Sequence, residues 1–391
     1  MPAEYQIGFL GTMSGIGAEV ERQLNSQAAS LGLSPSAVSV MDEAAMPARD
    51  RKRPFIAVFF GYAGADDASH PILADLIADS VVILPVVPSL AGASRYIPAS
   101  LSHINCFEST ATKPNVERIV TILLENFRLL RSDRRLFISY KRAESQGVAI
   151  QVYETLDALG FDVFLDTRGV PPATDFQSIL WHRLADSDVV LLLDTPEFRQ
   201  SRWTVQELAR ANATSVQILH FLWPGVAPDP YSAFSQFVQL KATDFVSAAL
   251  TGPDSRFDDK LINRVGELVE DLRARAMAAR YRYLVDNFCD QARALNKDPA
   301  VQSTRFIALD IAADHRIAVV PAIGVPTAER YQEIERAISK DPKKFQKIWL
   351  LYDERGILQG WLEHLDWLND HLPVIAVRVS VASDLLAKEA A

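Results

Sequence analysis

Cysteine is scarce in this sequence, and its two cysteines, Cys106 and Cys289, lie far apart along the chain. A disulfide scaffold needs a denser set, so this usage favours a reducing cytoplasm. Long apolar runs are missing too, because no stretch approaches the roughly 20 residues that a membrane-spanning helix needs. The first residues, Met-Pro-Ala-Glu-Tyr, form no basic leader. We therefore expect a cytoplasmic protein without a membrane partner.

Positive charge is also in short supply, since 49 acidic residues outnumber 40 lysines and arginines and leave a net charge of −9. A general nucleic-acid-binding surface would carry a basic stripe, so we expect no nucleic-acid partner. The histidines have no metal-ligand spacing with cysteine or carboxylate, and no metal site is expected. The sequence also lacks a G-x-S-x-G motif, and neither cysteine has the context of a catalytic nucleophile.

The chain does contain enough apolar residues for several packed cores. With 391 residues, 49% of them apolar, two or three domains are expected. Three short apolar runs, at residues 136–140, 161–165 and 188–193, alternate with helical patterns. Strands that alternate with helices predict βαβ units in a parallel sheet, with functional groups at the carboxyl ends of the strands.

Two further α/β modules flank this region, so we divide the chain into residues 1–131, 132–277 and 278–391. In the first module, a glycine-rich turn at residues 11–17 fits a tight strand-to-helix connection better than a phosphate-binding motif. The remaining strands are expected at residues 6–10, 54–60, 81–87, 216–223, 305–309, 317–320, 347–351 and 374–377. The remaining helices are expected at residues 18–31, 71–79, 116–130, 258–277, 281–295, 327–339 and 360–371.

Three polar stretches have simpler interpretations. The basic residues at 128–135 indicate a solvated linker rather than a phosphate site. Residues 226–242 are rich in proline and are expected to form a loop. In the C-terminal module, Asp310, Asp314 and residues 353–355 either line a ligand pocket at the strand ends or are solvated acidic loops.

An internal similarity links the first two modules. Residues 78–84 and 185–191 both begin with Ala-Asp-Ser and continue into an apolar run. Downstream, Ser-Arg-Tyr at 94–96 parallels Ser-Arg-Trp at 201–203, and Ser100 then corresponds to Glu207. One hypothesis is that the N-terminal module is a degenerate copy of the middle one. The alternative is chance similarity between buried strands.

Four motifs of the middle module occur in a family-like order. They are Phe-Ile-Ser-Tyr at 137–140, Phe-Leu-Asp at 164–166 with Pro-Pro at 171–172, Leu-Ala-Asp-Ser-Asp at 184–188, and Ser-Arg-Trp at 201–203 with Glu-Leu at 207–208. In order and spacing they resemble a bacterial Toll/interleukin-1 receptor (TIR) domain over about residues 133–250. The resemblance implies a flavodoxin-like parallel sheet for this module, flanked by the two other α/β modules.

Many TIR domains cleave NAD at the nicotinamide–ribose bond, so the resemblance implies NAD as a substrate, with no separate cofactor. Nicotinamide leaves as a neutral amine, and one carboxylate can stabilise the oxocarbenium-like transition state without a general acid. Glu207 matches the family's catalytic glutamate in the Trp-x-x-x-Glu-Leu motif, and Trp203 lies on the same helical face. Without the resemblance, Glu207 would be interpreted as a surface carboxylate paired with Arg210.

Further substrate-binding residues are implied at the ends of the first two strands. Ser139, Tyr140, Lys141 and Arg142 are expected beside the NAD pocket, where a basic residue could meet the pyrophosphate. The alternative for the two cations is a solvated loop. Asp166 is expected either to contact a ribose hydroxyl or to cap its loop. The residues expected in structural roles are Trp181, Asp186 and Ser187.

The resemblance also implies regulation by self-association. In this family a loop of one TIR domain generally completes the site of its neighbour, so the flanking modules are candidate sensors or oligomerisation elements. A bacterial defence or signalling effector, activated by an unidentified trigger, is the expected role. Two alternatives remain: a non-catalytic TIR scaffold for protein–protein signalling, and a cyclase that makes a cyclic ADP-ribose signal.

Overall fold

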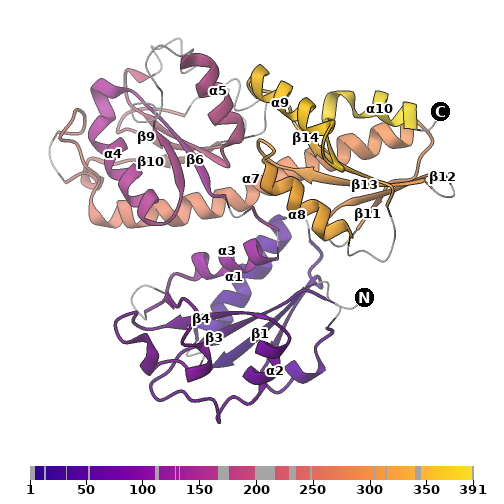
Figure 1. The fold of residues 1–391 in the computed structure, drawn as a ribbon. Coiled ribbons are helices and arrows are strands. Elements are labelled where there is room, and N and C mark those ends of the chain that lie inside the picture. Colours follow the sequence, from indigo (N-terminus) through magenta and orange to yellow (C-terminus); the bar gives the residue numbers. More distant parts are fainter. Residues whose placement is uncertain are drawn as a thin grey trace. The chain divides into compact units, whose positions relative to one another are not determined.

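The chain folds into two compact units, Met1–Ser132 and Asp133–Ala391, which are described separately. The described residues form three five-stranded sheets, one in the first unit and two in the second (Figure 1). The computed structural model describes residues 5–12, 15–31, 33–51, 53–110, 114–127, 129–131, 133–165, 176–198, 216–228, 235–246, 249–302, 305–312, 315–339 and 345–389.

The N-terminal unit is a parallel α/β sheet. Its elements are β1 (Tyr5–Gly11), α1 (Ile16–Ser30), β2 (Val38–Asp42), η1 (Met46–Ala48), β3 (Phe55–Phe60), α2 (Ile72–Ala78), β4 (Val82–Val87), η2 (Ala93–Arg95), η3 (Ala99–Leu101), β5 (Phe107–Glu108) and α3 (Val116–Asn126). The strands are arranged in the order β2-β1-β3-β4-β5, and every neighbouring pair is parallel. Helices α1 and α3 cover one face and α2 the other (Figure 1). The central strands are buried on both sides, as their apolar runs predict.

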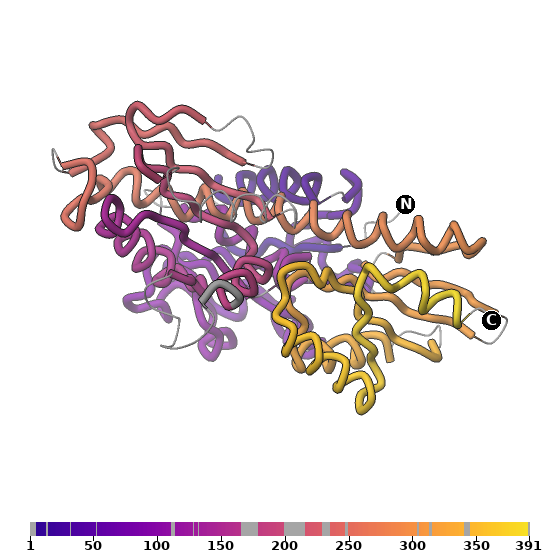
Figure 2. The backbone as a smooth tube through the Cα atoms, turned by 90° about the horizontal axis from the view of Figure 1, so that it is seen from above, coloured from indigo at the N-terminus to yellow at the C-terminus, as the bar shows by residue number. Residues whose placement is uncertain are grey.

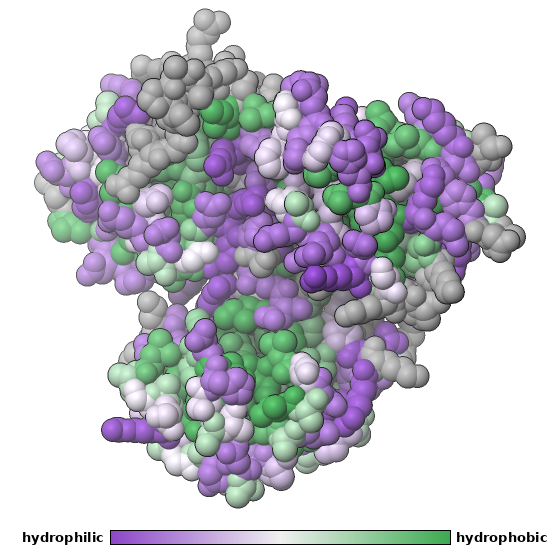
Figure 3. Space-filling model, viewed as in Figure 1, coloured by the Kyte–Doolittle hydropathy of each residue, from purple (hydrophilic) through white to green (hydrophobic). Residues whose placement is uncertain are grey.

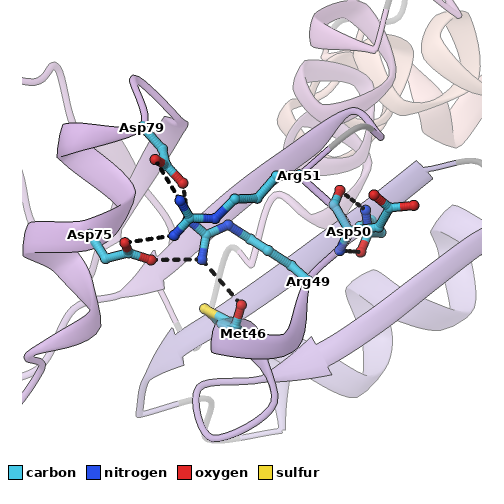
Figure 4. Close-up of polar contacts among 7 residues, drawn as sticks. Met46, Arg49, Asp50, Arg51, Asp75 and Asp79 are labelled. Atoms are coloured by element: carbon cyan, nitrogen blue, oxygen red, sulfur yellow. Dashed lines mark hydrogen bonds and ion pairs between the residues drawn. The ribbon is translucent and has the colours of Figure 1, made fainter.

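Two arginines tie the turn before β3 to helix α2 (Figure 4). The side chain of Arg49 is only 2% exposed, and it pairs with Asp75 at 2.9 Å and with Asp79. Arg51 contacts the same two carboxylates at 2.8 and 3.3 Å. The hydrogen bond from Arg49 lowers the pKa of Asp75 below its ordinary value. A buried guanidinium needs such partners, because an unpaired charge there would be costly.

The second unit begins with the sheet that the three central apolar runs predict. Its elements are β6 (Arg135–Tyr140), α4 (Arg142–Ala158), β7 (Asp162–Leu165), α5 (Phe176–Asp186), β8 (Val189–Asp194), β9 (Gln217–Leu222), β10 (Ser235–Gln239), η5 (Ala242–Asp244) and α7 (Asp259–Ala294). The order is β10-β9-β8-β6-β7, all parallel. Apolar residues of α4 and α7 pack on one face, and those of α5 pack on the other. This is the doubly wound α/β architecture expected from the sequence.

The two parallel sheets have the same topology. Numbered from the first strand of each module, both run in the order 2-1-3-4-5. Different orders would have excluded the hypothesis of an internal copy. Because this order is common among flavodoxin-like folds, it does not by itself demonstrate common origin, and the repeat stays a prediction.

The C-terminal module has a mixed sheet in the order β11-β12-β13-β14-β15. Its elements are β11 (Ala300–Val301), β12 (Ile307–Ala312), β13 (His315–Ala322), α8 (Ala328–Ser339), β14 (Lys347–Tyr352), α9 (Gln359–Asn369), β15 (Val374–Arg378), η6 (Val379–Val381) and α10 (Ala382–Glu389). Strands β13, β14 and β15 are parallel, whereas β11 and β12 are antiparallel to their neighbours. Helices α8 and α9 cover one face, and α7 and α10 the other.

Helix α7, the long orange helix in Figure 2, belongs to two cores at once. Its first half contributes Val265 and Val269 to the core beside β6 and β8, and its second half contributes Leu284 and Phe288 to the core of the C-terminal sheet. The sequence predicted two helices, 258–277 and 281–295, but the structure has one helix of 36 residues. The expected module boundary at residue 277 therefore lies inside a continuous helix.

Two further expectations need correction, and one strand was not expected. Residues 226–242 include a strand, β10, which pairs in parallel with β9. An unpredicted strand, β2, forms the edge of the N-terminal sheet. Arg134 is not part of a solvated linker, because it is 4% exposed, pairs with Glu270 and lies 3.9 Å from the ring centroid of Phe161. Within the basic run, Arg134 thus helps to pack α7 against the sheet.

The visible surface differs between the two units. In Figure 3 hydrophilic residues dominate the part that belongs to residues 133–391, whereas hydrophobic residues gather near the middle of the N-terminal unit. Among the described helices, none has both the length and the apolar content that crossing a bilayer requires. Even α7, the longest of these, carries many charged residues.

Candidate functional site

The carboxyl edge of the second sheet begins at Ser139 and Tyr140, the last residues of β6. Successive side chains of a strand point to opposite faces. Tyr140 is 8% exposed and belongs to the core shared with α4 and α7. Ser139 therefore lies on the other face, where α5 packs. Phe198 and Val216, which flank residues 199–215, pack on this same face. The connection that contains Glu207 in the sequence thus starts and ends on the side of Ser139.

Lys141 and Arg142 form the start of α4. Lys141 is the residue that precedes the helix, and its carbonyl accepts hydrogen bonds from the backbone N–H groups of Glu144 and Ser145, both at 2.9 Å. The non-helical φ and ψ angles of the buried Ser145 then separate the first turn from the rest of the helix. Arg142 is exposed and has no ion-pair partner among the described residues. Both cations therefore lie at the carboxyl edge of the sheet.

Two carboxylates that the sequence did not suggest surround Lys141. Its Nζ lies 2.5 Å from Glu197 Oε2 and 3.6 Å from Glu144 Oε1. The backbone N–H of Glu197 donates to Glu144 Oε2 at 3.3 Å. The hydrogen bond with Glu197 raises the pKa of Lys141, and the same bond lowers the pKa of Glu197. Glu197 follows β8, so the rule that sites form at carboxyl strand ends could have identified it.

Close packing behind this turn holds Glu144 in place. A Cβ atom on Gly147 would lie 2.4 Å from the carbonyl oxygen of Pro253 and 2.5 Å from that of Ser255. The same loop donates the Gly252 N–H to the carbonyl of Glu144 at 2.6 Å. Only glycine at position 147 permits this approach, because both contacts are to backbone atoms.

A buried polar group joins β8, β9 and β10 on the face of Ser139. The Oγ of Ser235 lies 3.1 Å from His220 Nε2, and His220 Nδ1 lies 3.9 Å from Asp194 Oδ2. The order of these groups is that of a hydrolytic triad, but 3.9 Å exceeds hydrogen-bond length. His220 and Asp194 are each 1% exposed, so a substrate does not reach them. This arrangement serves the packing of the three strands rather than nucleophilic catalysis.

Three expected site residues, Asp166, Trp203 and Glu207, lie outside the residues that the structure describes. Their proposed roles therefore stay predictions. Ser139, Lys141 and Arg142 are brought together at one edge, and Tyr140 is directed into the core of the opposite face.

The Ala-Asp-Ser-Asp motif before β8 is consumed in structural contacts. Arg280 of α7 donates to the carbonyls of Ser187 and Ala185 at 2.9 and 2.7 Å. Asp186 Oδ1 accepts the backbone N–H of Val325 at 2.8 Å, and its Oδ2 pairs with Arg135. These contacts agree with the structural roles expected for Asp186 and Ser187.

Helix α5 also touches the C-terminal module through a histidine. The backbone N–H of Leu358 donates to His182 Nδ1 at 3.4 Å, and the His182 ring lies 5.8 Å from that of Trp361. Burial lowers the pKa of His182 below its ordinary value. Trp181 is partly buried against the core on the α5 face, consistent with the expected packing role.

The acidic residues of the C-terminal module do not form one pocket. Asp310 pairs with Arg316 at the start of β13, whereas Asp353 follows β14 and binds Arg355 at 2.5 Å. Because β12 runs antiparallel to β13, these two carboxylates lie at opposite ends of the sheet. Asp314 lies outside the described residues. A cavity beside Asp353 and Arg280 has a volume of only about 10 Å³, room for a water molecule rather than a larger ligand.

Comparison with known proteins identifies the middle module alone. The family model described as TIR domain matches residues 136–261. No curated protein matches the chain. Two solved structures give weak overall matches. Tagatose-6-phosphate ketose/aldose isomerase from Escherichia coli is 13% identical, covering 72% of this chain and 83% of that one with a TM-score of 0.19. A protein assigned as a phosphosugar isomerase from Silicibacter pomeroyi is 10% identical, covering 72% and 86% with a TM-score of 0.20.

Proposed function

Because residues 136–261 form a TIR domain, we propose that the protein cleaves NAD between nicotinamide and ribose, with Glu207 as the catalytic carboxylate. The observation that carries the proposal is Glu207 in the Trp-x-x-x-Glu-Leu sequence within the matched residues. The ends of that connection, Phe198 and Val216, lie on the same face of the sheet as Ser139. Glu207 itself lies outside the described residues, and its position beside Lys141 and Arg142 is part of the proposal.

The chemistry needs few protein groups. The C1′–N bond of NAD breaks, and its electron pair passes to the nicotinamide ring, which leaves as a neutral molecule. The carboxylate of Glu207 stabilises the positive charge that develops on the ribose. Water then bonds to C1′ and loses one proton, which gives ADP-ribose. Capture by an adenine nitrogen of the same molecule instead of water would give a cyclic product.

The other site residues have binding roles in this proposal. Arg142, exposed at the start of α4, and Lys141 beside it meet the pyrophosphate, where two cations and the helix N-terminus favour negative charge. In the proposal, Ser139 and Asp166 bind polar groups of the ribose, and Trp203 forms a wall of the site. Tyr140 supports β6 from the opposite face. Self-association of TIR domains activates the enzyme, and the protein acts as a bacterial defence or signalling effector.

One experiment tests the enzyme directly. The purified full chain, at high concentration or with a crowding agent, is incubated with NAD, and the products are separated by chromatography. We expect nicotinamide with ADP-ribose or its cyclic form from the wild type. Glu207→Ala and Glu207→Gln should release none above background. Glu154→Ala, which removes an exposed carboxylate from α4, is the matched control and should retain activity. Equal nicotinamide release by the wild type and both Glu207 variants would contradict the assignment.

A non-catalytic scaffold is the second candidate, and one observation favours it. Lys141, the cation nearest the strand end, is already paired with Glu197 and Glu144, so a phosphate would have to compete with these carboxylates. A scaffold would associate through its TIR domain but leave NAD intact under every condition in which it assembles. Measuring assembly by light scattering in the same samples separates an inactive enzyme from a scaffold.

A further inference from the structure

Lys141 is outnumbered by the carboxylates that it pairs with at this end of the sheet. One ammonium group faces two carboxylates, at 2.5 Å for Glu197 and 3.6 Å for Glu144. The nearest described cation that is not already paired is Arg142. An anionic ligand that approaches Lys141 therefore meets a net charge of about −1 from these three residues, which opposes binding.

The two carboxylates are held very differently. The Glu144 side chain is 14% exposed, its Oε2 accepts the Glu197 N–H, and its backbone carbonyl accepts the Gly252 N–H at 2.6 Å. As an acidic residue in the first turn of α4, it is also favoured by the helix dipole. The Glu197 side chain is 59% exposed, and its main contact is the ion pair with Lys141, beside a further side-chain interaction with Glu144. Glu197 can swing into water without uncovering a buried group, whereas Glu144 cannot.

We infer that Glu197 is an internal counter-ion that occupies Lys141 in the resting protein and must be displaced when a pyrophosphate binds. This inference rests on the proposed function, because it assigns the pyrophosphate of NAD to Lys141. Glu197 is then a residue that sets substrate affinity, not one that takes part in bond cleavage. The Glu197 carboxylate marks the position where a phosphate oxygen comes to lie, about 2.5 Å from the Lys141 Nζ.

The expected size of the effect follows from the exposure of the pair. Exposed ion pairs are weak, so removing the competitor should tighten anion binding by about two- to fivefold. Salt screens exposed charges, so the difference between wild type and variant should shrink as ionic strength rises. Turnover at saturating NAD should be unaffected, since the competitor is gone from Lys141 once substrate is bound. The variant should therefore lower KM for NAD while kcat stays the same.

The test is calorimetric titration of the full chain with inorganic pyrophosphate, and with NAD in a Glu207→Ala background to prevent turnover. Glu197→Gln should bind both ligands about two- to fivefold more tightly than the parent protein. The matched control is Glu154→Gln on α4, which changes the net charge of the protein by the same amount. It should leave both affinities unchanged. Glu197→Asp, whose shorter side chain keeps the charge but reaches Lys141 less well, should give an intermediate value. Circular dichroism confirms that each variant is folded.

A double variant identifies the cation involved. In a Lys141→Gln background, Glu197→Gln should no longer improve binding, because nothing remains to be released. In an Arg142→Gln background the improvement should persist. The inference is overturned if Glu197→Gln leaves pyrophosphate affinity unchanged, or if its gain survives the loss of Lys141.

The outcomes also separate this inference from the proposed function. If Glu197→Gln binds pyrophosphate more tightly but no protein releases nicotinamide, the proposed NAD cleavage is wrong and the counter-ion role of Glu197 is supported. If nicotinamide is released but the KM for NAD is the same for wild type and Glu197→Gln, the counter-ion role is wrong and the proposed NAD cleavage is supported.

Discussion

Gly147 is the residue at which α4 and the loop at 252–256 come closest. An added Cβ would collide with the carbonyls of Pro253 and Ser255, which belong to backbone and cannot rotate away. Gly147→Ala should therefore cost about 1–3 kcal/mol of unfolding free energy, the usual range for overpacking. Gly266 is the matched control: its Cβ would meet only the flexible end of Leu159.

Gly266→Ala should be neutral or should stabilise the protein by up to about 1 kcal/mol, because alanine favours a helix interior over glycine. Urea unfolding, followed by circular dichroism, measures both variants. Equal stability of the two would mean that the loop at 252–256 adapts freely.

Arg273 makes a second prediction at the scale of one side chain. It is fully buried and its Nε lies 2.7 Å from Asp188 Oδ2, which is 1% exposed. Arg273→Met leaves that carboxylate buried without its cation, so a loss of about 3–5 kcal/mol is expected. Arg275→Met is the control, because Arg275 pairs with Asp271 on the surface, where such a loss is typically below about 1 kcal/mol. Thermal denaturation of both variants checks the difference.

At the scale of secondary structure, His182 connects α5 to the turn before α9. Its Nδ1 accepts the Leu358 N–H, which requires the neutral ring. Burial lowers the His182 pKa from 6.5, and Arg183 and Arg135 act in the same direction while Asp186 opposes them. A lowered pKa in the folded state means that this contact stabilises above about pH 6.5 and is lost as the pH falls through the folded value.

The unfolding free energy should thus decline below pH 6.5 more steeply in the wild type than in His182→Asn, whose amide oxygen can accept the same bond without titrating. Denaturant unfolding between pH 5 and 8 measures the difference in slope. Parallel profiles for the two proteins would show that His182 does not carry this dependence.

Most elements were predictable because their apolar periodicity is strong. The runs at 136–140 and 188–193 became β6 and β8, almost residue for residue. Strand β10 was missed because its burial is only partial and two prolines, Pro228 and Pro230, precede it. The edge strand β2, likewise, has a weak apolar pattern and mostly half-buried side chains. An edge strand packs against fewer neighbours, so its sequence is less constrained.

The continuity of α7 was missed for a different reason. Where the helix passes from one core to the next, its buried residues include Arg273 and Arg280, which bind a carboxylate and two carbonyls. The apolar periodicity is therefore interrupted where these two arginines make their buried polar contacts. The site was only half predictable as well: the motif gave Lys141, but its partners Glu197 and Glu144 follow from how β8 and α4 meet.

At the scale of the whole molecule, the division after residue 132 predicts which fragments fold. A fragment of residues 133–391 keeps both sheets that share α7 and should unfold in one cooperative transition. A fragment of residues 133–277 ends within α7 and loses Arg280, which satisfies the carbonyls at the end of α5. It should be markedly less stable or aggregate.

Size-exclusion chromatography and circular dichroism of the two fragments test this expectation. Residues 1–131, with their own core, serve as the positive control and should fold alone. A stable, monomeric 133–277 fragment would mean that the second half of the helix contributes little to the TIR domain.

The shared helix has a mechanical consequence. With 36 residues, α7 is about 54 Å long. Its first half packs against the sheet that contains β6 and β8, and its second half packs against the sheet that contains β13 and β14. Because the helix is continuous, a tilt or rotation of the C-terminal sheet should also move the part of α7 that packs on the TIR sheet. A ligand that shifts the C-terminal sheet would thus shift the TIR sheet through rigid-body movement of α7.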